Sequence, residues 1–300
     1  MSDQEPTAGP ARPPAAAPAP APRTRRAGRN LPAAIGVGLV LAGSLVASLL
    51  WWLPGFVILA TTLIGLAAIE VHQALKRVEM TSAILVIEIG LVAMMAGGYL
   101  VTRRAPDLAS TYLLVCLGLM VLASFLVRVP GGAKGFVRDT AASMLTIAYL
   151  PLMGAFASLL VADDQGVARV LLWIGTVVCS DTGGYIAGVL FGRHPMAPTI
   201  SPKKTWEGFA GSVVLGGTFA ALVGVWLLGT AWWTGALIGV VLVLASIAGD
   251  LVESLVKRDL GVKDMGSFLP GHGGVLDRID AMVLSAPAAW ILMHLLIPGA

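Results

Sequence analysis

A cluster of charged residues near the carboxyl end of the sequence has the composition of a phosphate-binding site. The segment Asp250–Asp280 holds 10 of the 37 charged residues of the 300-residue chain. Four of its polar side chains follow each other at i, i+3, i+4 and i+7, so they share one face if the preceding helix continues past Gly249. These four are Asp250, Glu253, Ser254 and Lys257. The shared face predicts one wall of a pocket at the end of a helix bundle.

A glycine-rich turn and two aspartates follow this face. The turn, Leu269–Gly274, has few side chains, so its backbone can approach a ligand closely and its N–H groups could hold an anion. Asp277 and Asp280 are three positions apart and face the same way. Carboxylate oxygens suit Mg²⁺, and neighbouring cations would neutralise phosphate charge. The alternative is a solvated loop that only fixes topology, but such a loop requires Lys and Arg and gains little from aspartates at membrane boundaries.

A second polar cluster, Ser201–Gly208, precedes another apolar segment. Ser201 is a residue type that caps a following turn. Lys203 and Lys204 could bind phosphate, and Trp206 suits interface depth. Alone, the stretch is more typical of a membrane anchor. Beside the first cluster, it is a candidate wall of a substrate site.

Two acidic residues fall inside apolar segments, where a charge is costly. This cost favours a functional role for Asp181, with Tyr185 one turn away as its candidate polar partner. Glu88 either pairs between helices or lines a lipid groove. Glycines at 184, 188 and 192 recur every four residues, and we interpret them as a helix-packing stripe. We interpret five further residues as structural: His72, His194, His294, Cys116 and Cys179.

The scaffold that positions these clusters must lie in a membrane. The chain is 57% hydrophobic and 12% charged, whereas about a quarter of residues are charged in soluble domains. Its net charge of +3 is too small to indicate nucleic-acid binding. A bilayer core of about 30 Å needs roughly 20 apolar residues per helix, so the uncharged runs Asn30–Ile69 and Gly208–Gly249 each predict a hairpin of two spans. Single spans are expected at about 82–102, 108–127, 140–162, 168–191 and 281–297.

We therefore expect an all-α polytopic membrane protein of about nine transmembrane helices, with its N-terminus in the cytoplasm. In that arrangement 17 of the 20 Lys and Arg residues lie on the cytoplasmic side, as the positive-inside rule requires. Residues 1–30 are rich in Pro, Ala and Arg, which predicts a disordered cytoplasmic tail rather than a cleaved signal peptide. Residues 31–300 then form the transmembrane domain.

These residues together resemble the bacterial CDP-diacylglycerol synthase (phosphatidate cytidylyltransferase) family. Its signature is Ser-x-x-Lys-Arg, then Lys-Asp, then Pro-Gly-His-Gly-Gly-x-x-Asp-Arg-x-Asp. The sequence matches it without a break at Ser254, Lys257, Arg258, Lys263, Asp264, Pro270, Gly271, His272, Gly273, Gly274, Asp277, Arg278 and Asp280. The family's Ser-Pro-Lys-Lys-Thr-Trp-Glu-Gly stretch is intact at Ser201–Gly208, and its Asp-Thr-x-x-Tyr-x-x-Gly pattern is met at Asp181–Gly188. The resemblance covers about residues 30–300.

The resemblance implies an enzyme of phospholipid biosynthesis that converts CTP and phosphatidate into CDP-diacylglycerol and pyrophosphate. It implies a requirement for Mg²⁺, with K⁺ as an optional second ion, and a homodimer among membrane lipids of the bacterial inner membrane, its active site facing the cytoplasm. Asp250 and Asp277 would bind the metal, and Asp280 would support them. The cations expected to meet phosphates are Lys257, Arg258, Lys263 and Arg278. The expected substrate-binding residues are Asp181, Ser201, Lys203, Lys204, Thr205, His272, Gly273 and Gly274.

Two other functions are compatible with parts of this pattern. A CTP-dependent polyprenol or phytol kinase shares CTP and a membrane bundle, but it transfers the terminal phosphate and releases CDP. A transporter would carry ionisable groups toward the midplane and show paired repeats. In this sequence the ionisable groups gather at one face, and we find no repeat.

Overall fold

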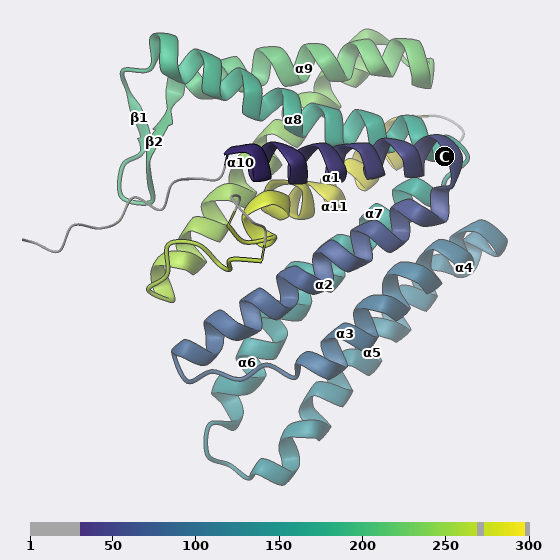
Figure 1. The fold of residues 1–300 in the computed structure, drawn as a ribbon. Coiled ribbons are helices and arrows are strands. Elements are labelled where there is room, and N and C mark those ends of the chain that lie inside the picture. Colours follow the sequence, from purple (N-terminus) through teal and green to yellow (C-terminus); the bar gives the residue numbers. More distant parts are fainter. Residues whose placement is uncertain (1–30, 269–272, 298–300) are drawn as a thin grey trace, which may run out of the picture.

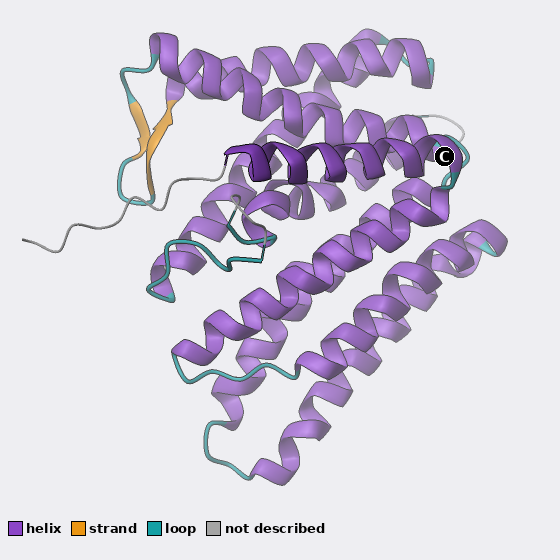
Figure 2. Cartoon of the chain, in the orientation of Figure 1, coloured by secondary structure: helices purple, strands orange, loops and turns teal. Residues whose placement is uncertain are grey.

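The computed structural model describes residues 31–268 and 273–297, which form a bundle of helices with one small β-hairpin (Figures 1 and 2). The elements in chain order are α1 (Leu31–Trp51), α2 (Leu53–Arg77), α3 (Ile84–Val92), η1 (Ala93–Gly97), α4 (Gly98–Arg104), η2 (Pro106–Leu108), α5 (Ala109–Arg128), η3 (Val129–Gly131), α6 (Phe136–Ile147), η4 (Ala148–Leu152), α7 (Met153–Ala162), α8 (Gly166–Phe191), β1 (Pro195–Ala197), β2 (Ser201–Thr205), α9 (Trp206–Leu228), α10 (Trp232–Asp259) and α11 (Leu276–Leu296). The helices η1 and η4 are π-helical turns that continue the helices on either side of them.

Eight helical stretches of the described chain are long and apolar enough to cross a membrane. They are Leu53–Arg77, Ile84–Arg104, Pro106–Gly131, Phe136–Ala162, Gly166–Phe191, Trp206–Leu228, Trp232–Asp259 and Leu276–Leu296. Helix α1 adds a shorter apolar helix before them. The predicted all-α polytopic fold is therefore confirmed, and the chain is a multi-pass membrane protein.

Each of the two predicted hairpins is present as two helices separated by a short break. The first breaks at Trp52, between α1 and α2, and Pro54 follows in the first turn of α2, where its missing N–H costs no hydrogen bond. The second breaks after α9, where Gly229 adopts a φ of +64°. Trp51 and Trp232 near these breaks are exposed, as expected for side chains at a membrane interface.

Helices α8, α9, α10 and α11 pack one against the next and carry most of the polar residues of interest (Figure 1). The α8–α9 contact depends on glycine, because a Cβ atom at Gly183 would lie 2.5 Å from the carbonyl oxygen of Gly211. Gly184 and Gly188 also face α9, near Ser212 and Gly208. The interpretation of this stripe as a packing surface is confirmed.

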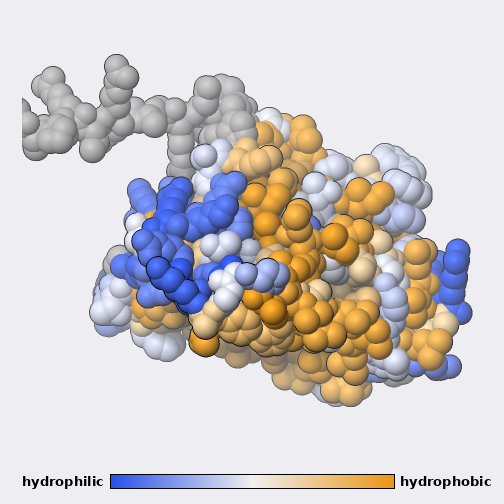
Figure 3. Space-filling view, turned by 90° about the horizontal axis from the view of Figure 1, so that it is seen from below, coloured by the Kyte–Doolittle hydropathy of each residue, from blue (hydrophilic) through white to orange (hydrophobic). Residues whose placement is uncertain are grey.

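On the face shown in Figure 3, apolar residues cover the middle of the molecule and hydrophilic residues gather toward its ends. The charged side chains buried in the described bundle include one arginine. Arg169 in α8 is 1% exposed, and its Nε atom lies 3.1 Å from Asp163 Oδ1. This buried arginine is neutralised locally, as a charge inside a bundle requires.

The β-hairpin projects beyond one end of α8 and α9 (Figure 2). Its strands β1 and β2 are antiparallel, with Pro195 opposite Thr205. The expectation that Ser201 caps a following turn is wrong, because residues 201–205 are extended and the helix begins only at Trp206. Thr205 is the cap instead, and its Oγ1 accepts a hydrogen bond from the N–H of Gly208 at 3.1 Å.

Candidate active site

The C-terminal end of α10 and the N-terminal end of α11 bring the first polar cluster together. Helix α10 continues to Asp259, so the predicted extension past Gly249 is confirmed. Gly249 allows a close approach of the two helices, because a Cβ atom there would lie 2.9 Å from the carbonyl oxygen of Asp280. The polar face of α10 therefore lies directly against the first turns of α11.

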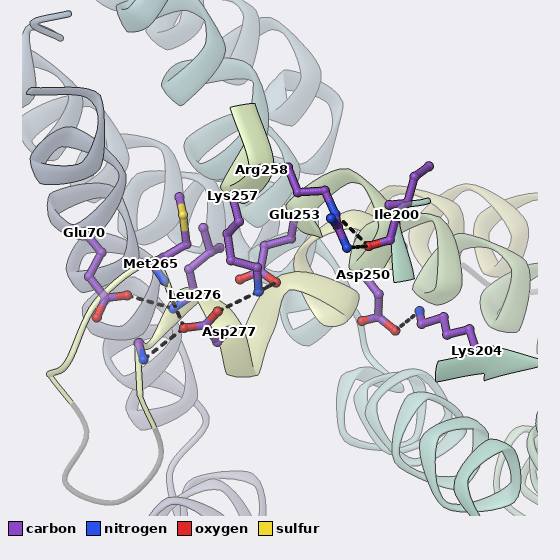
Figure 4. A network of polar contacts seen from close by, with 11 residues as sticks. Glu70, Ile200, Lys204, Asp250, Glu253, Lys257, Arg258, Met265, Leu276 and Asp277 are labelled. Atoms are coloured by element: carbon purple, nitrogen blue, oxygen red, sulfur yellow. Dashed lines mark hydrogen bonds and ion pairs between the residues drawn. The ribbon is translucent and has the colours of Figure 1, made fainter. Parts of the chain in front are cut away.

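Lys257 joins the two helices (Figure 4). Its Nζ atom lies 2.5 Å from Glu253 Oε2, one turn back on α10, and 2.8 Å from Asp277 Oδ1 on α11. Glu253 is buried, and the lysine is largely buried. A single ammonium group thus offsets two carboxylates in a partly dehydrated site, where such interactions are stronger than in water.

Asp277 is held by backbone donors as well as by Lys257. Its Oδ2 atom accepts hydrogen bonds from the N–H of Gly274 at 3.0 Å and from the N–H of Met265 at 3.2 Å. An aspartate in the first turn of a helix also interacts favourably with the helix dipole. These contacts fix the carboxylate in one orientation.

The described part of the glycine-rich turn closes over Asp277. Gly273 has a φ of +92°, a conformation that favours glycine, and Gly274 is buried. The sequence suggested that N–H groups of this turn could hold an anion. In the described part of the turn, the Gly274 N–H donates to the carboxylate of Asp277. Asp280, one turn further along α11, is buried. His272 lies outside the described residues.

The second polar cluster meets α10 at Asp250. Lys204 Nζ on β2 lies 2.5 Å from Asp250 Oδ2, and both side chains are partly buried (Figure 4). They line a polar pocket of about 330 Å³ between α8, α9, α10 and the hairpin. The pocket is also lined by Asp181, Tyr185, Ser201, Lys203 and Thr205. The structure therefore brings six of the predicted site residues, and the Tyr185 partner, around one cavity.

Three of the predicted cations lie elsewhere. Arg258 donates from Nε to the carbonyl oxygen of Ile200 at 2.8 Å, which ties the end of α10 to the hairpin (Figure 4). Lys263 is exposed beyond α10. Arg278 lines a different, apolar pocket. In the described residues none of these three cations lines the polar pocket, and neither does Lys257.

The cytidylyltransferase family profile matches residues 32–296, which include both polar clusters. The chain belongs to the cytidylyltransferase family. Among its relatives, the phosphatidate cytidylyltransferase of Mycobacterium leprae is 42% identical over 284 residues, covering 91% of this chain and 90% of that protein. The corresponding protein of Mycobacterium bovis is 40% identical over 309 residues and 97% of both chains. The phosphatidate cytidylyltransferase of Helicobacter pylori is 39% identical over 146 residues, covering 49% of this chain and 54% of that protein.

This cytidylyltransferase has one buried carboxylate at the site that sequence reasoning missed. Glu70 on α2 is 3% exposed, and its Oε2 atom accepts a hydrogen bond from the N–H of Leu276 at 3.0 Å. Gly266 and Gly274 leave room for it, since Cβ atoms there would lie 2.2 and 2.9 Å from its carboxylate oxygens. The sequence contained a signal that could have identified Glu70, because it is the first charged residue after the uncharged run Asn30–Ile69.

The remaining polar residues of this cytidylyltransferase that the sequence singled out make local contacts. Glu88 lies against α2, where a Cβ atom at Gly65 would be 2.7 Å from its Oε2 atom. His72, His194 and His294 contact Ser82, Glu207 and Trp290, respectively. The two cysteines are partly buried and free. These contacts agree with structural roles for the histidines and cysteines.

Proposed function

We propose that this cytidylyltransferase forms CDP-diacylglycerol and pyrophosphate from CTP and phosphatidate. The observation that carries the proposal is the polar pocket beside Lys204 and Asp250, at one end of an otherwise apolar bundle. One substrate is a lipid and the other is water-soluble, so their reaction requires a polar site at the membrane boundary. The relatives named phosphatidate cytidylyltransferase, which match nearly the whole chain, support the same activity.

The reaction joins two anions, so neutralisation of charge is the main task of the protein. A phosphate oxygen of phosphatidate attacks the α-phosphorus of CTP; a new phosphorus–oxygen bond forms, and the bond to the β-phosphate bridging oxygen breaks, which releases pyrophosphate. Lys203 and Lys204 are the cations of the pocket and would hold the triphosphate. Such positioning and charge stabilisation account for most of the catalysis in phosphoryl transfer. Ser201 and Thr205 would hydrogen-bond phosphate oxygens from the same strand.

Asp250 and Asp277 are the residues that we propose for Mg²⁺, with Asp280 supporting them and K⁺ as an optional second ion. In the described residues no three Asp, Glu, His or Cys side chains converge on one point. However, Mg²⁺ usually takes one or two carboxylates and completes its coordination with water and substrate phosphates. The buried Glu253 Oε1, which lacks a hydrogen-bond partner in the described chain, adds an oxygen of the required type. When bound, the ion would supply a Lewis acid for the departing charge.

We further propose that Lys257 keeps the carboxylates of α10 and α11 in place and meets a substrate phosphate. It already contacts Glu253 and Asp277, so it lies where the two helices supply negative charge. Arg258, Lys263 and Arg278 are the other cations of this segment and would attract the anionic substrates. Asp181, which lines the polar pocket, would contact substrate. His272, Gly273 and Gly274 would contact the nucleotide.

The proposed orientation places the polar end of the bundle and the N-terminus in the cytoplasm of a bacterial cell, with the bundle in its inner membrane. The distribution of Lys and Arg supports it. A homodimer is part of the proposal through the family resemblance. A protease-sensitive tag at the N-terminus tests the orientation: it should resist protease in intact spheroplasts and be cut after lysis, whereas cleavage in intact spheroplasts would reverse the topology.

Product analysis tests the proposed activity. Purified protein in mixed micelles, given CTP, Mg²⁺ and phosphatidate, should release pyrophosphate and form CDP-diacylglycerol. Release of CDP with a polyprenol or phytol acceptor would instead indicate the kinase. If CTP binds and neither product forms, the proposal fails; uptake of a solute into proteoliposomes would then favour a transporter.

A further inference from the structure

A tyrosine in the middle of the bundle has a buried hydroxyl without a hydrogen-bond partner. Tyr149 is 7% exposed, and its hydroxyl oxygen bonds to no group of the described chain. A buried tyrosine usually finds a partner for its hydroxyl, because an unpaired polar group inside a protein is costly. Phenylalanine would fill the same space without that cost. Packing alone therefore does not explain a tyrosine at this position.

The backbone around Tyr149 is specialised as well. The residue lies in η4, the π-helical turn between α6 and α7, and this turn contains Pro151. A proline lacks the N–H that a regular helix requires, and a π-helical turn with its extra residue accommodates it. Such turns are frequent at functional sites. The η4 turn packs against α11, the helix that carries Asp277 and Asp280.

The charges that act on the Tyr149 hydroxyl come from the candidate active site. Four of its carboxylates interact electrostatically with the hydroxyl, in decreasing order Asp280, Glu253, Asp250 and Asp277. Electrostatic interactions weaken with distance, so this order places the hydroxyl nearest in effect to Asp280 and Glu253. The α6–α7 segment thus presents a neutral hydrogen-bond donor to the acidic face that α10 and α11 form.

Two of these carboxylates have room for such a donor. The ion pairs of Lys204 and Lys257 are made with Asp250, Glu253 and Asp277, and none of them involves Asp280. Asp280 is 7% exposed, and the Oε1 atom of Glu253 is buried without a hydrogen-bond partner in the described chain. Buried carboxylates require donors, and a hydroxyl supplies one without adding charge.

We propose that Tyr149 is a positioning residue whose hydroxyl donates a hydrogen bond to the Asp280 carboxylate during turnover and keeps it oriented beside Glu253. The inference rests on the proposed function and adds a third helical segment to the site. Hydrogen bonds of catalytic groups are often long in the free enzyme and tighten when substrates bind. A hydroxyl-to-carboxylate bond is short and charge-assisted, so it fixes the carboxylate well. Because Tyr149 acts through Asp280, its loss should affect turnover and not substrate binding.

Tyr149→Phe tests this role, because it removes the hydroxyl and keeps the ring. We expect kcat to fall about tenfold or more, with KM for CTP and for phosphatidate changed by less than about threefold. Thermal stability should stay equal or rise, since an unpaired buried hydroxyl is removed. Wild-type kcat in the folded fraction, with or without a lower Tm, would overturn the proposal. A loss confined to KM would also overturn it, because the hydroxyl would then bind substrate.

Tyr112→Phe is the matched control. The Tyr112 hydroxyl on α5 donates to the carbonyl oxygen of Ala93 at 2.9 Å, outside both polar clusters. Its removal should lower Tm and leave kcat within about twofold of the wild type. The two variants should therefore show opposite effects on stability and turnover. Equal losses of kcat in both would contradict a specific role for Tyr149.

A spectroscopic measurement tests the contact without turnover. The full chain in lipid nanodiscs carries 3-fluorotyrosine in place of Tyr149, and the fluorine resonance reports hydrogen bonding and charge at the adjacent hydroxyl. We expect CTP with dioleoyl phosphatidate to shift this resonance, and Asp280→Asn to remove most of that shift. The same label in place of Tyr112 should give one resonance under all of these conditions. A resonance from position 149 that ignores both the substrates and Asp280→Asn would contradict the contact.

The same experiments separate this inference from the proposed function. If the wild type forms CDP-diacylglycerol and Tyr149→Phe forms it at the same rate, the positioning role is wrong and the activity stands. If the wild type binds CTP but forms no CDP-diacylglycerol, the proposed function fails, and the role of Tyr149 in turnover fails with it.

Discussion

Glu70 Oε2 accepts a hydrogen bond from the backbone N–H of Leu276 at 3.0 Å, which joins α2 to the first turn of α11 across 206 residues of sequence (Figure 4). The N–H groups of a first helical turn have no partner within the helix, and a carboxylate is a favourable one. Because Asp277 directly follows Leu276, Glu70 holds the backbone that carries the central aspartate of the site. We regard it as a positioning residue.

Replacement of Glu70 should therefore lower turnover more than substrate binding. Glu70→Ala leaves the Leu276 N–H without its partner, which costs about 1–3 kcal/mol, and frees the start of α11. We expect kcat to fall roughly tenfold to a hundredfold, with KM for CTP changed by less than about threefold. Glu70→Gln keeps an acceptor oxygen and should recover part of the loss. Glu79→Gln, at an exposed glutamate beyond α2, is the control. If Glu70 had a purely structural role, Glu70→Ala would instead lower thermal stability and leave kcat of the folded fraction unchanged.

Asp277→Asn should abolish most turnover and leave the protein folded. The amide oxygen can still accept hydrogen bonds from Gly274 and Met265, but the charge that Lys257 and the proposed Mg²⁺ require is gone. Loss of such electrostatic stabilisation typically lowers kcat by about a hundredfold or more. Asp259→Asn, at the exposed end of α10, is the matched control and should retain full activity. Near-normal turnover by Asp277→Asn in detergent would exclude the metal role.

Lys204→Ala should weaken CTP binding. The lysine lies in the polar pocket against Asp250, so its removal takes away a phosphate-binding cation and leaves a carboxylate without its partner. We expect KM for CTP to rise about tenfold or more, since charge-assisted hydrogen bonds are among the stronger ones. Lys134→Ala, in the exposed loop before α6, tests for a general effect of charge. Similar KM values for both variants would place CTP outside this pocket.

Gly183→Ala should destabilise the bundle at the α8–α9 contact. Its new Cβ atom would lie 2.5 Å from the carbonyl oxygen of Gly211, so the two helices must separate, at a cost of about 1–3 kcal/mol. The same substitution at Gly43, where a Cβ atom meets nothing within 4 Å, should be neutral or stabilise by up to about 1 kcal/mol. Thermal unfolding in detergent compares the two variants. A lower Tm for Gly43→Ala than for Gly183→Ala would contradict glycine-dependent packing.

The sequence alone predicted the helices well, because a membrane imposes one length and one composition on every span. The two hairpins and the extension of α10 past Gly249 follow from uncharged runs and from spacing along a single helix. The pairings across helices did not follow from these patterns. Lys204 with Asp250 and Glu70 with Leu276 depend on how distant segments pack, and periodicity within one segment carries no information about its neighbour. The cap at Thr205 was missed because Ser201 is an equally good cap by type, and only the extended backbone before Trp206 decides between them.

The length of α10 has a consequence for how the substrates meet. Its 28 residues rise about 42 Å, some 12 Å more than the hydrocarbon core of a bilayer. Unless the helix tilts strongly, the surplus carries Glu253 and Lys257 to the depth of the lipid headgroups. Under the proposed activity, phosphatidate then need not be lifted out of the bilayer: it reaches the enzyme by diffusion in two dimensions, and the released CDP-diacylglycerol stays in the same leaflet.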